Sequence, residues 1–182
     1  MDATTKQGEA RTLTRDELLA ALPRYRWYWG SEAKRHFEKL AGTPAEMWAK
    51  SERGDILLWL AAWAGIDRRQ VVGAACAVAR QALKYVPPGE ERPRIALETA
   101  EAWARGEPGV TLLQVRTADA AAAAADAADD AAAAAADAAA AADAAAADAD
   151  AWRLKRAESL KASADLVRSK ISWADVEASL LR

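Results

Sequence analysis

Residues 117–151 contain only alanine and aspartate after the initial Thr117, and this tract constrains the fold of the 182-residue chain more than any other feature. Alanine has the highest helix propensity of the amino acids and loses no side-chain entropy when a helix forms. The chain beyond Gly109 contains neither glycine nor proline. Thr111 and Gln114 have the spacing of a capping box. The pattern therefore predicts a long helical region that begins at residue 111.

The aspartates of the tract concentrate on one side of such a helix. At about 100° per residue, five of the eight lie within about 20° of one line, because they are spaced by 7, 4, 7 and 11 residues. Two interpretations stay open: the stripe keeps an alanine-rich helix in solution, or it is an acidic ridge that docks on a basic partner. The candidate partner-binding residues are Asp119, Asp126, Asp130, Asp137 and Asp148.

Helix boundary signals are dense in the first 110 residues. Thr14 and Thr43 are each followed three residues later by a glutamate, as in a capping box. Glycines just beyond apolar stretches predict left-handed helix ends, at positions 42, 65 and 106. No strand-length run alternates with period two, so the predicted fold class is an all-α helical bundle. The expected helices lie near residues 15–22, 31–41, 44–52, 55–64, 67–86 and 93–105.

Two of these helices are predicted to form the core. Helix 55–64 leaves almost no polar face, so we expect it to be buried nearly all round. Helix 67–86 carries a wide apolar stripe, which predicts an inner helix. Cys76 lies on that stripe among small apolar residues and is expected to behave as a small buried hydrophobe.

The C-terminal residues predict that the chain folds back. One unbroken rod from residue 111 to residue 170 would be about 90 Å long, far longer than a compact core of 110 residues. The sequence leaves a rod and a helical hairpin open, and we expect a break near residues 148–151. We predict a globular helical domain at 1–110, then a long Ala/Asp-rich helix and an amphipathic helix that packs back on the bundle at 111–182. The apolar residues of that last helix are Leu160, Ala164, Val167, Ile171, Trp173 and Val176.

Charge and composition limit which classes of partner and which cellular compartment we expect. The net charge is −2 and the tract holds eight aspartates without a lysine or arginine, which argues against nucleic acid. Residues 24–30 interleave arginine with aromatic side chains, as single-strand binding grooves do, but we expect the aromatic side chains at 27–29 to cap the core instead. The apolar run 56–66 is much shorter than the about 20 residues that span a bilayer. One cysteine and no secretory pattern at residues 1–5 favour the cytoplasm.

The residues that common catalytic mechanisms use are scarce. The chain has one histidine, His36, and one cysteine, so it offers neither a zinc ligand set nor a nearby Cys–His pair. His36 lies among charged residues and is expected at the surface or at the edge of the core. Aspartates about two turns apart on a rigid helix diverge, which opposes calcium binding. The sequence predicts no enzyme, no cofactor and no metal.

Several segments carry a resemblance to a known family. They are residues 54–61 (GDILLWLA), 67–69 (DRR), 74–80 (AACAVAR), 85–87 (YVP) and 91–106 (ERPRIALETAEAWARG), followed by the alanine-rich tract and by 164–168 (ADLVR) with 172–173 (SW). These segments resemble alanine-rich immunity proteins of bacterial polymorphic toxin systems, whose role is assigned by association. The family pattern usually has a cysteine where this chain has Ser163, and its tract often carries tyrosines that are missing here. The resemblance implies binding and neutralisation of a toxin, and it implies no catalytic or binding residues.

Three classes of function follow from these observations. The first is an immunity or inhibitor protein that binds a toxin with a basic surface. The second is an ice-binding alanine-rich helix, because Asp126, Asp137 and Asp148 repeat every 11 residues as in antifreeze helices. A charged aspartate, unlike the threonine of those helices, opposes a fit to ice. The third is a structural module that self-associates through the alanine face.

Overall fold

The computed structural model describes residues 11–23, 28–86, 88–118 and 148–182. Every regular element in these ranges is helical and none is a strand, which confirms the all-α class. Residues 112–118 form one such helical segment. The others are α1 (Arg15–Ala21), α2 (Tyr28–Glu38), α3 (Pro44–Lys50), α4 (Gly54–Trp63), α5 (Arg68–Ala79), the 3₁₀ helix η1 (Arg80–Tyr85), α6 (Arg92–Ala104), α8 (Asp148–Lys170) and α9 (Trp173–Leu180).

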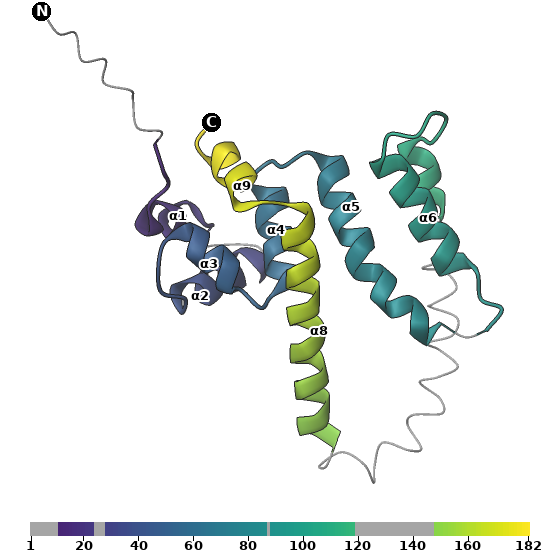
Figure 1. The fold of residues 1–182 in the computed structure, drawn as a ribbon, viewed down its shortest axis with the longest axis horizontal. Helices are drawn as coiled ribbons and strands as arrows, with labels where there is room; N and C mark the ends of the chain where they lie inside the picture. The colour runs from purple at the N-terminus through teal and green to yellow at the C-terminus, as the bar shows by residue number, and fades with distance from the viewer. Residues whose placement is uncertain (1–10, 24–27, 87, 119–147) are drawn as a thin grey trace, which may run out of the picture.

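The helices are arranged around a central pair. α4 and α8 pack side by side, α5 contacts both of them, and α6 packs on α5 (Figure 1). α2 contacts α4 at the other side of the bundle, α1 contacts α2, and α9 contacts α3. The order α4 and α8, then α5, then α6 leaves α6 at one edge of the molecule (Figure 1).

The predicted helix ends are found where local chemistry sets them. The hydroxyls of Thr14 and Thr43 each accept a hydrogen bond from the amide three residues later, at 3.3 Å, and both capping boxes are complete. The box at Thr111 is also formed, by reciprocal bonds with Gln114. Gly42, Gly65 and Gly106 have φ values of 112°, 87° and 74°, so glycine supplies the left-handed ends as predicted.

The close approach of α4 to α8 depends on Gly54. A Cβ atom built on Gly54 would lie 2.6 Å from the backbone nitrogen of Ala164 and 2.6 Å from the backbone carbon of Ser163. Real Cβ atoms do not come that close to backbone, so a larger residue would force the two helices apart. Ser163 is itself buried, and its hydroxyl donates to the carbonyl of Ser159 at 2.7 Å.

The prediction that helix 55–64 is buried nearly all round is wrong for one face. Trp59 and Trp63 stack on each other with ring centroids 5.8 Å apart, and Trp63 is 38% exposed. The uniformly apolar sequence predicted burial of both faces, but neighbouring helices cover only one of them. The fully buried residues of α4 are Ile56, Leu57, Leu60 and Ala61.

The expected inner helix at 67–86 is also only partly correct. Its α-helical part ends at Ala79 and continues as the 3₁₀ helix η1. Ala74 and Cys76 are buried, whereas Ala79 and Ala82 are exposed. A wide alanine-rich stripe permits close packing on several sides but does not show how much of it the neighbours cover.

The C-terminal helices contribute to the same core as α1 to α5. Ala164, Val167, Ile171 and Val176 are fully buried, as their periodicity predicted. Residues 148–151, near which we predicted a break, are helical and continuous with the rest of α8, and the residues before them, 119–147, lie outside the described ranges, so the break stays a prediction. The N-terminal residues of the core are Leu18, Leu22, Ala33, Phe37, Met47, Trp48, Ile56, Leu57, Leu60, Ala61 and Ala74.

Candidate functional site

The acidic stripe, which is the predicted partner-binding site, falls almost entirely outside the described residues. Asp119, Asp126, Asp130 and Asp137 lie in the range 119–147, which the structure does not describe. Asp148 is the first residue of α8, but its side chain is not described. The structure brings none of these five carboxylates to a described site, and the stripe stays a prediction.

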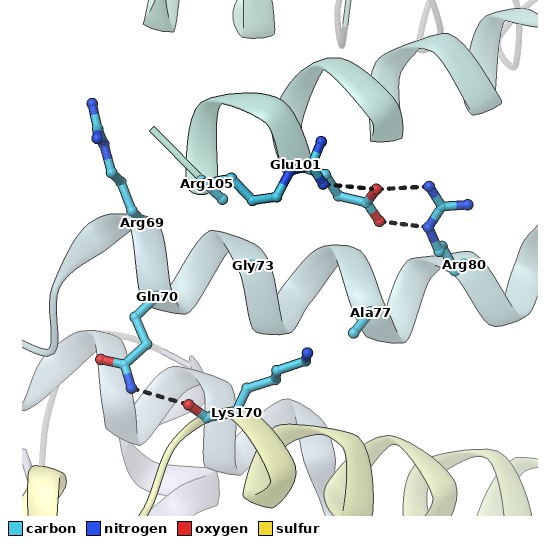
Figure 2. Close-up of a pocket in the computed structure, with 9 residues that line it drawn as sticks. Arg69, Gln70, Gly73, Ala77, Arg80, Glu101, Arg105 and Lys170 are labelled. Carbon is cyan, nitrogen blue, oxygen red and sulfur yellow. Dashed lines mark hydrogen bonds and ion pairs between the residues drawn. The ribbon is translucent and has the colours of Figure 1, made fainter. Parts of the chain in front are cut away.

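An open groove between α5, α6 and the C-terminal end of α8 is the main candidate site in the described residues (Figure 2). Its volume is about 470 Å³. Figure 2 shows α5 along the middle of the groove, α6 on one side and the end of α8 on the other. The lining residues are Arg69, Gln70, Gly73, Ala77, Arg80, Glu101, Ala104, Arg105 and Lys170.

The floor of the groove is made by small residues on one face of α5. Gly73 and Ala77 follow Arg69 by four and eight residues, and Arg80 comes three residues later, so these four positions share a helix face. The two arginines stand at opposite ends of a stretch without side-chain bulk (Figure 2). Ala104 faces this stretch from α6, and a Cβ on Gly73 would lie 3.7 Å from its Cβ.

One carboxylate lies between two arginines at the wall of the groove. Arg80 donates two hydrogen bonds to Glu101, the bond from Nη2 measuring 2.6 Å, and Arg105 lies 3.8 Å from the same carboxylate. The hydrogen bonds from Arg80 lower the pKa of Glu101, and those bonds also raise the pKa of Arg80. Arg105 pairs in addition with Glu107, at 2.7 Å.

Two further cations line the groove, Arg69 and Lys170, and the charge of Lys170 also helps to lower the pKa of Glu101. Among the described residues, neither Arg69 nor Lys170 makes an ion pair. The Arg69 guanidinium lies 5.4 Å from the centre of the Trp103 ring, a cation–π distance. The Lys170 carbonyl accepts a hydrogen bond from the Gln70 side chain at 3.0 Å, which ties the end of α8 to α5. The groove therefore carries four cations and one carboxylate.

A second polar cluster joins α2 to the start of α4. Arg53 pairs with Glu32 at 3.0 Å and with Asp55 at 2.8 Å, and these bonds raise the pKa of Arg53. His36 Nε2 lies 2.9 Å from the Ser51 hydroxyl. Burial, followed by the positive charge of Arg53, lowers the pKa of His36.

The His36–Ser51 pair joins α2 to the residue that ends α3. Ser51 is fully buried, so its hydroxyl does not meet solvent. Its carbonyl accepts a hydrogen bond from Arg168 of α8 at 2.6 Å. His36 is half-buried at the edge of the core, close to where the sequence placed it.

Cys76 is buried as expected, and burial raises the pKa of its thiol. It lines an apolar hollow of about 260 Å³ between α5, α6 and residues 112–118. Within the described ranges, no three His, Cys, Asp or Glu side chains gather as a metal site would require. No described helix combines the length and apolar character needed to cross a bilayer.

The basic groove was not predicted from the sequence, because the aspartate tract is the charge pattern that stands out there. The available signal was the face Arg69, Gly73, Ala77 and Arg80, in which a helix-interior glycine lies between two arginines. Lys170 could not be assigned to the groove from the sequence, because it lies 100 residues along the chain from its contact Gln70.

The described residues form an all-α bundle with an open, charged groove at its edge. The model of one family, described as Imm-5 like putative immunity protein, matches residues 63–155. That range covers 93 of the 182 residues. The chain belongs to this immunity protein family, as the resemblance at 54–106 implied. The matched range includes every residue that lines the groove except Lys170. No curated protein and no solved structure matches the chain.

Proposed function

We propose that this chain is an immunity protein that binds a toxin in the cytoplasm and neutralises it by protein–protein contact, without catalysis. The match of the immunity protein family to residues 63–155 carries this proposal. An interface of ordinary size, about 800 Å² on each partner, would suffice for a stable complex. The partner is a protein toxin, and the toxin loses activity because the complex blocks it.

The arrangement of the reactive side chains supports a role without catalysis. The one histidine is engaged with a fully buried serine, and the one cysteine is buried with a raised pKa. A nucleophilic cysteine needs a lowered pKa and access to substrate. Cys76 has the opposite environment.

Immunity proteins of polymorphic toxin systems are encoded beside their toxins, so co-expression with a toxin gene found next to this one is the direct test. Cells that make the toxin alone should stop growing, and cells that also make this chain should grow. The two purified proteins should elute together in size-exclusion chromatography. Absence of both protection and a complex would overturn the proposal.

The acidic stripe is the proposed contact for a basic surface of the toxin. Changing Asp126, Asp130 and Asp137 together to asparagine removes three charges from the line and keeps side-chain size. If the stripe binds, the triple variant should lose affinity while its helix content by circular dichroism stays the same. Unchanged affinity would leave the stripe as a means of solubility alone.

A further inference from the structure

The groove between α5, α6 and α8 carries more positive charge than the described residues that line it neutralise. Glu101 is the one carboxylate of the lining, and it is already shared by Arg80 and Arg105. Arg69 and Lys170 are exposed and have no ion-pair partner in the described part of the chain. Figure 2 shows Arg69 at the end of the groove opposite Arg80, and Lys170 on the α8 side with its side chain extending along the floor.

The shape of the floor is a second, independent observation. A glycine in the interior of a helix is less favourable than alanine, because the glycine backbone loses more conformational freedom on folding. At Gly54 the tight contact with α8 requires that glycine, but at Gly73 an added Cβ would make only ordinary contact, 3.7 Å from Ala104. Packing within the described structure does not account for Gly73. Its effect is to leave open the middle of a groove bounded by cations.

The orientation of Arg69 favours a planar acidic group. Its guanidinium lies against the Trp103 ring, which restricts the side chain. Arginine presents paired N–H donors that match the two oxygens of a carboxylate. Lysine at position 170 adds a point charge from the other wall. The small floor leaves room for the backbone of an incoming segment between these two groups.

We infer that this groove binds an acidic segment of the toxin, with one carboxylate paired to Arg69, a second paired to Lys170, and the backbone between them lying over Gly73. This inference rests on the proposed function and names the contact by which the partner is held. A protein carboxylate is favoured over a nucleic-acid phosphate because the chain is net negative and its tract adds eight negative charges. A polyanion would be repelled, whereas a short acidic segment needs only the local field of the groove.

The groove is tested first with a defined probe. A short peptide of alternating glutamate and glycine is titrated into the full-length protein at low salt, beside the matching glutamine–glycine peptide. The amide signals of Gly73 and Ala77 and the indole N–H of Trp103 are followed by NMR. We expect these signals to move with the glutamate peptide and not with the glutamine peptide. Equal shifts with both peptides, or no shift with either, would overturn the inference.

Reversing the charge of Arg69 and Lys170, and of two cations outside the groove as a control, tests whether the groove charge binds the peptide. The double variant Arg69→Glu/Lys170→Glu should weaken binding of the glutamate peptide by about tenfold or more. The control Arg94→Glu/Lys161→Glu changes net charge equally on α6 and α8 outside the groove and should bind as the native protein does. Equal affinity of the groove variant and the native protein contradicts the inference. Circular dichroism verifies that both variants are folded.

A variant without any charge change tests the floor. Gly73→Leu should occupy the groove and abolish the peptide-induced shifts, while the helix content stays the same or rises. Undiminished peptide binding by this variant would overturn the inference. Inorganic phosphate and a single-stranded oligonucleotide are titrated in parallel, and tighter binding of either at these signals would overturn the assignment to an acidic protein segment.

The same variants separate this inference from the proposed function. If the toxin binds the native chain and the Arg69→Glu/Lys170→Glu variant equally well, the groove contact is wrong and the immunity function stands. If the glutamate peptide binds the groove but the native chain neither binds nor neutralises the toxin, recognition of carboxylates stands and the immunity function falls.

Discussion

Gly54 and Gly73 both lie in helices that pack on another helix, but only the first is required by its neighbours. Gly54→Ala should destabilise the fold by about 1–3 kcal/mol, because its Cβ would lie 2.6 Å from the backbone of α8. Gly73→Ala should stabilise it by about 0.5–1 kcal/mol, because the helix gains propensity and the new contact is ordinary. Urea unfolding of the two variants measures both effects, and a shift of the same sign in both would contradict this account.

His36 is expected to make stability depend on pH. Burial and Arg53 lower its pKa in the folded protein below the usual value of about 6.5. A lowered pKa means that the unfolded chain binds the proton more readily. The contribution of His36 is therefore fully present above about pH 6.5 and is lost as pH falls through that value toward the folded pKa.

Unfolding free energies at pH 7.5 and pH 5.5 measure this effect against a His36→Gln control. The native protein should lose more stability than the variant between these two conditions. The carboxyl groups whose pKa is lowered, such as Glu90 at about 2 and Asp55, lose their stabilising effect below pH 5.5. They therefore do not hide the effect of His36 between the two conditions. An equal loss in both proteins would show that His36 does not titrate as described.

The individual residues whose roles were predicted correctly act through neighbours that are close in the chain. The capping threonines and the left-handed glycines need partners only a few residues away, and Cys76 needed only the helix period. Gly54 and Lys170 could not be assigned from sequence, because their roles arise from residues about 100 positions distant. The acidic stripe lies outside the described residues and stays a prediction.

At the scale of elements, Arg168 joins α8 to the end of α3. Its guanidinium donates to the carbonyls of Ser51 and Trp48, at 2.6 Å and 3.2 Å, which would otherwise lack partners at the helix end. Arg168→Ala should cost about 1.5–3 kcal/mol, as expected for hydrogen bonds to a charged group. Lys161→Ala, which removes only an exposed pair with Glu52, should cost less than about 1 kcal/mol. Thermal unfolding of the two variants tests this order.

The positions of the helices along the chain agree with the sequence predictions more closely than the residues at which the helices begin and end. α2 begins three residues before the predicted residue 31 and ends at Glu38, where Lys39 and Leu40 bond three residues back and tighten the last turn. The single helix expected at 67–86 is α-helical only to Ala79 and 3₁₀ beyond it. Apolar periodicity predicts a continuous surface for packing, but it does not distinguish these two hydrogen-bond patterns.

At the scale of the whole molecule, the C-terminal helices complete the core that the N-terminal helices begin. Glu177 of α9 accepts a hydrogen bond from the Leu13 amide at 2.8 Å, and the Ser179 hydroxyl donates to the Ala64 carbonyl at 2.6 Å. Ile171 and Val176 are fully buried with residues of α1 to α5. The division into parts at 1–110 and 111–182 stays a prediction.

Removing α8 and α9 should therefore prevent cooperative folding. A chain that ends at residue 147 exposes the apolar faces of α4 and α5 that α8 covers. We expect a broad urea transition and loss of the near-ultraviolet circular dichroism of the core tryptophans. A sharp transition at the native midpoint would show instead that the first part folds independently.

A titration of toxin activity distinguishes neutralisation by binding, as proposed, from neutralisation by chemistry. Purified toxin from a toxin gene found beside this one is mixed with increasing amounts of this protein, and the remaining toxin activity is measured after each addition. Neutralisation by binding should lower toxin activity in proportion to the protein added, completely at a fixed stoichiometric ratio, with intact toxin recovered when the complex is dissociated. Full activity at excess protein, or permanent inactivation of toxin by a small fraction of an equivalent, would contradict it.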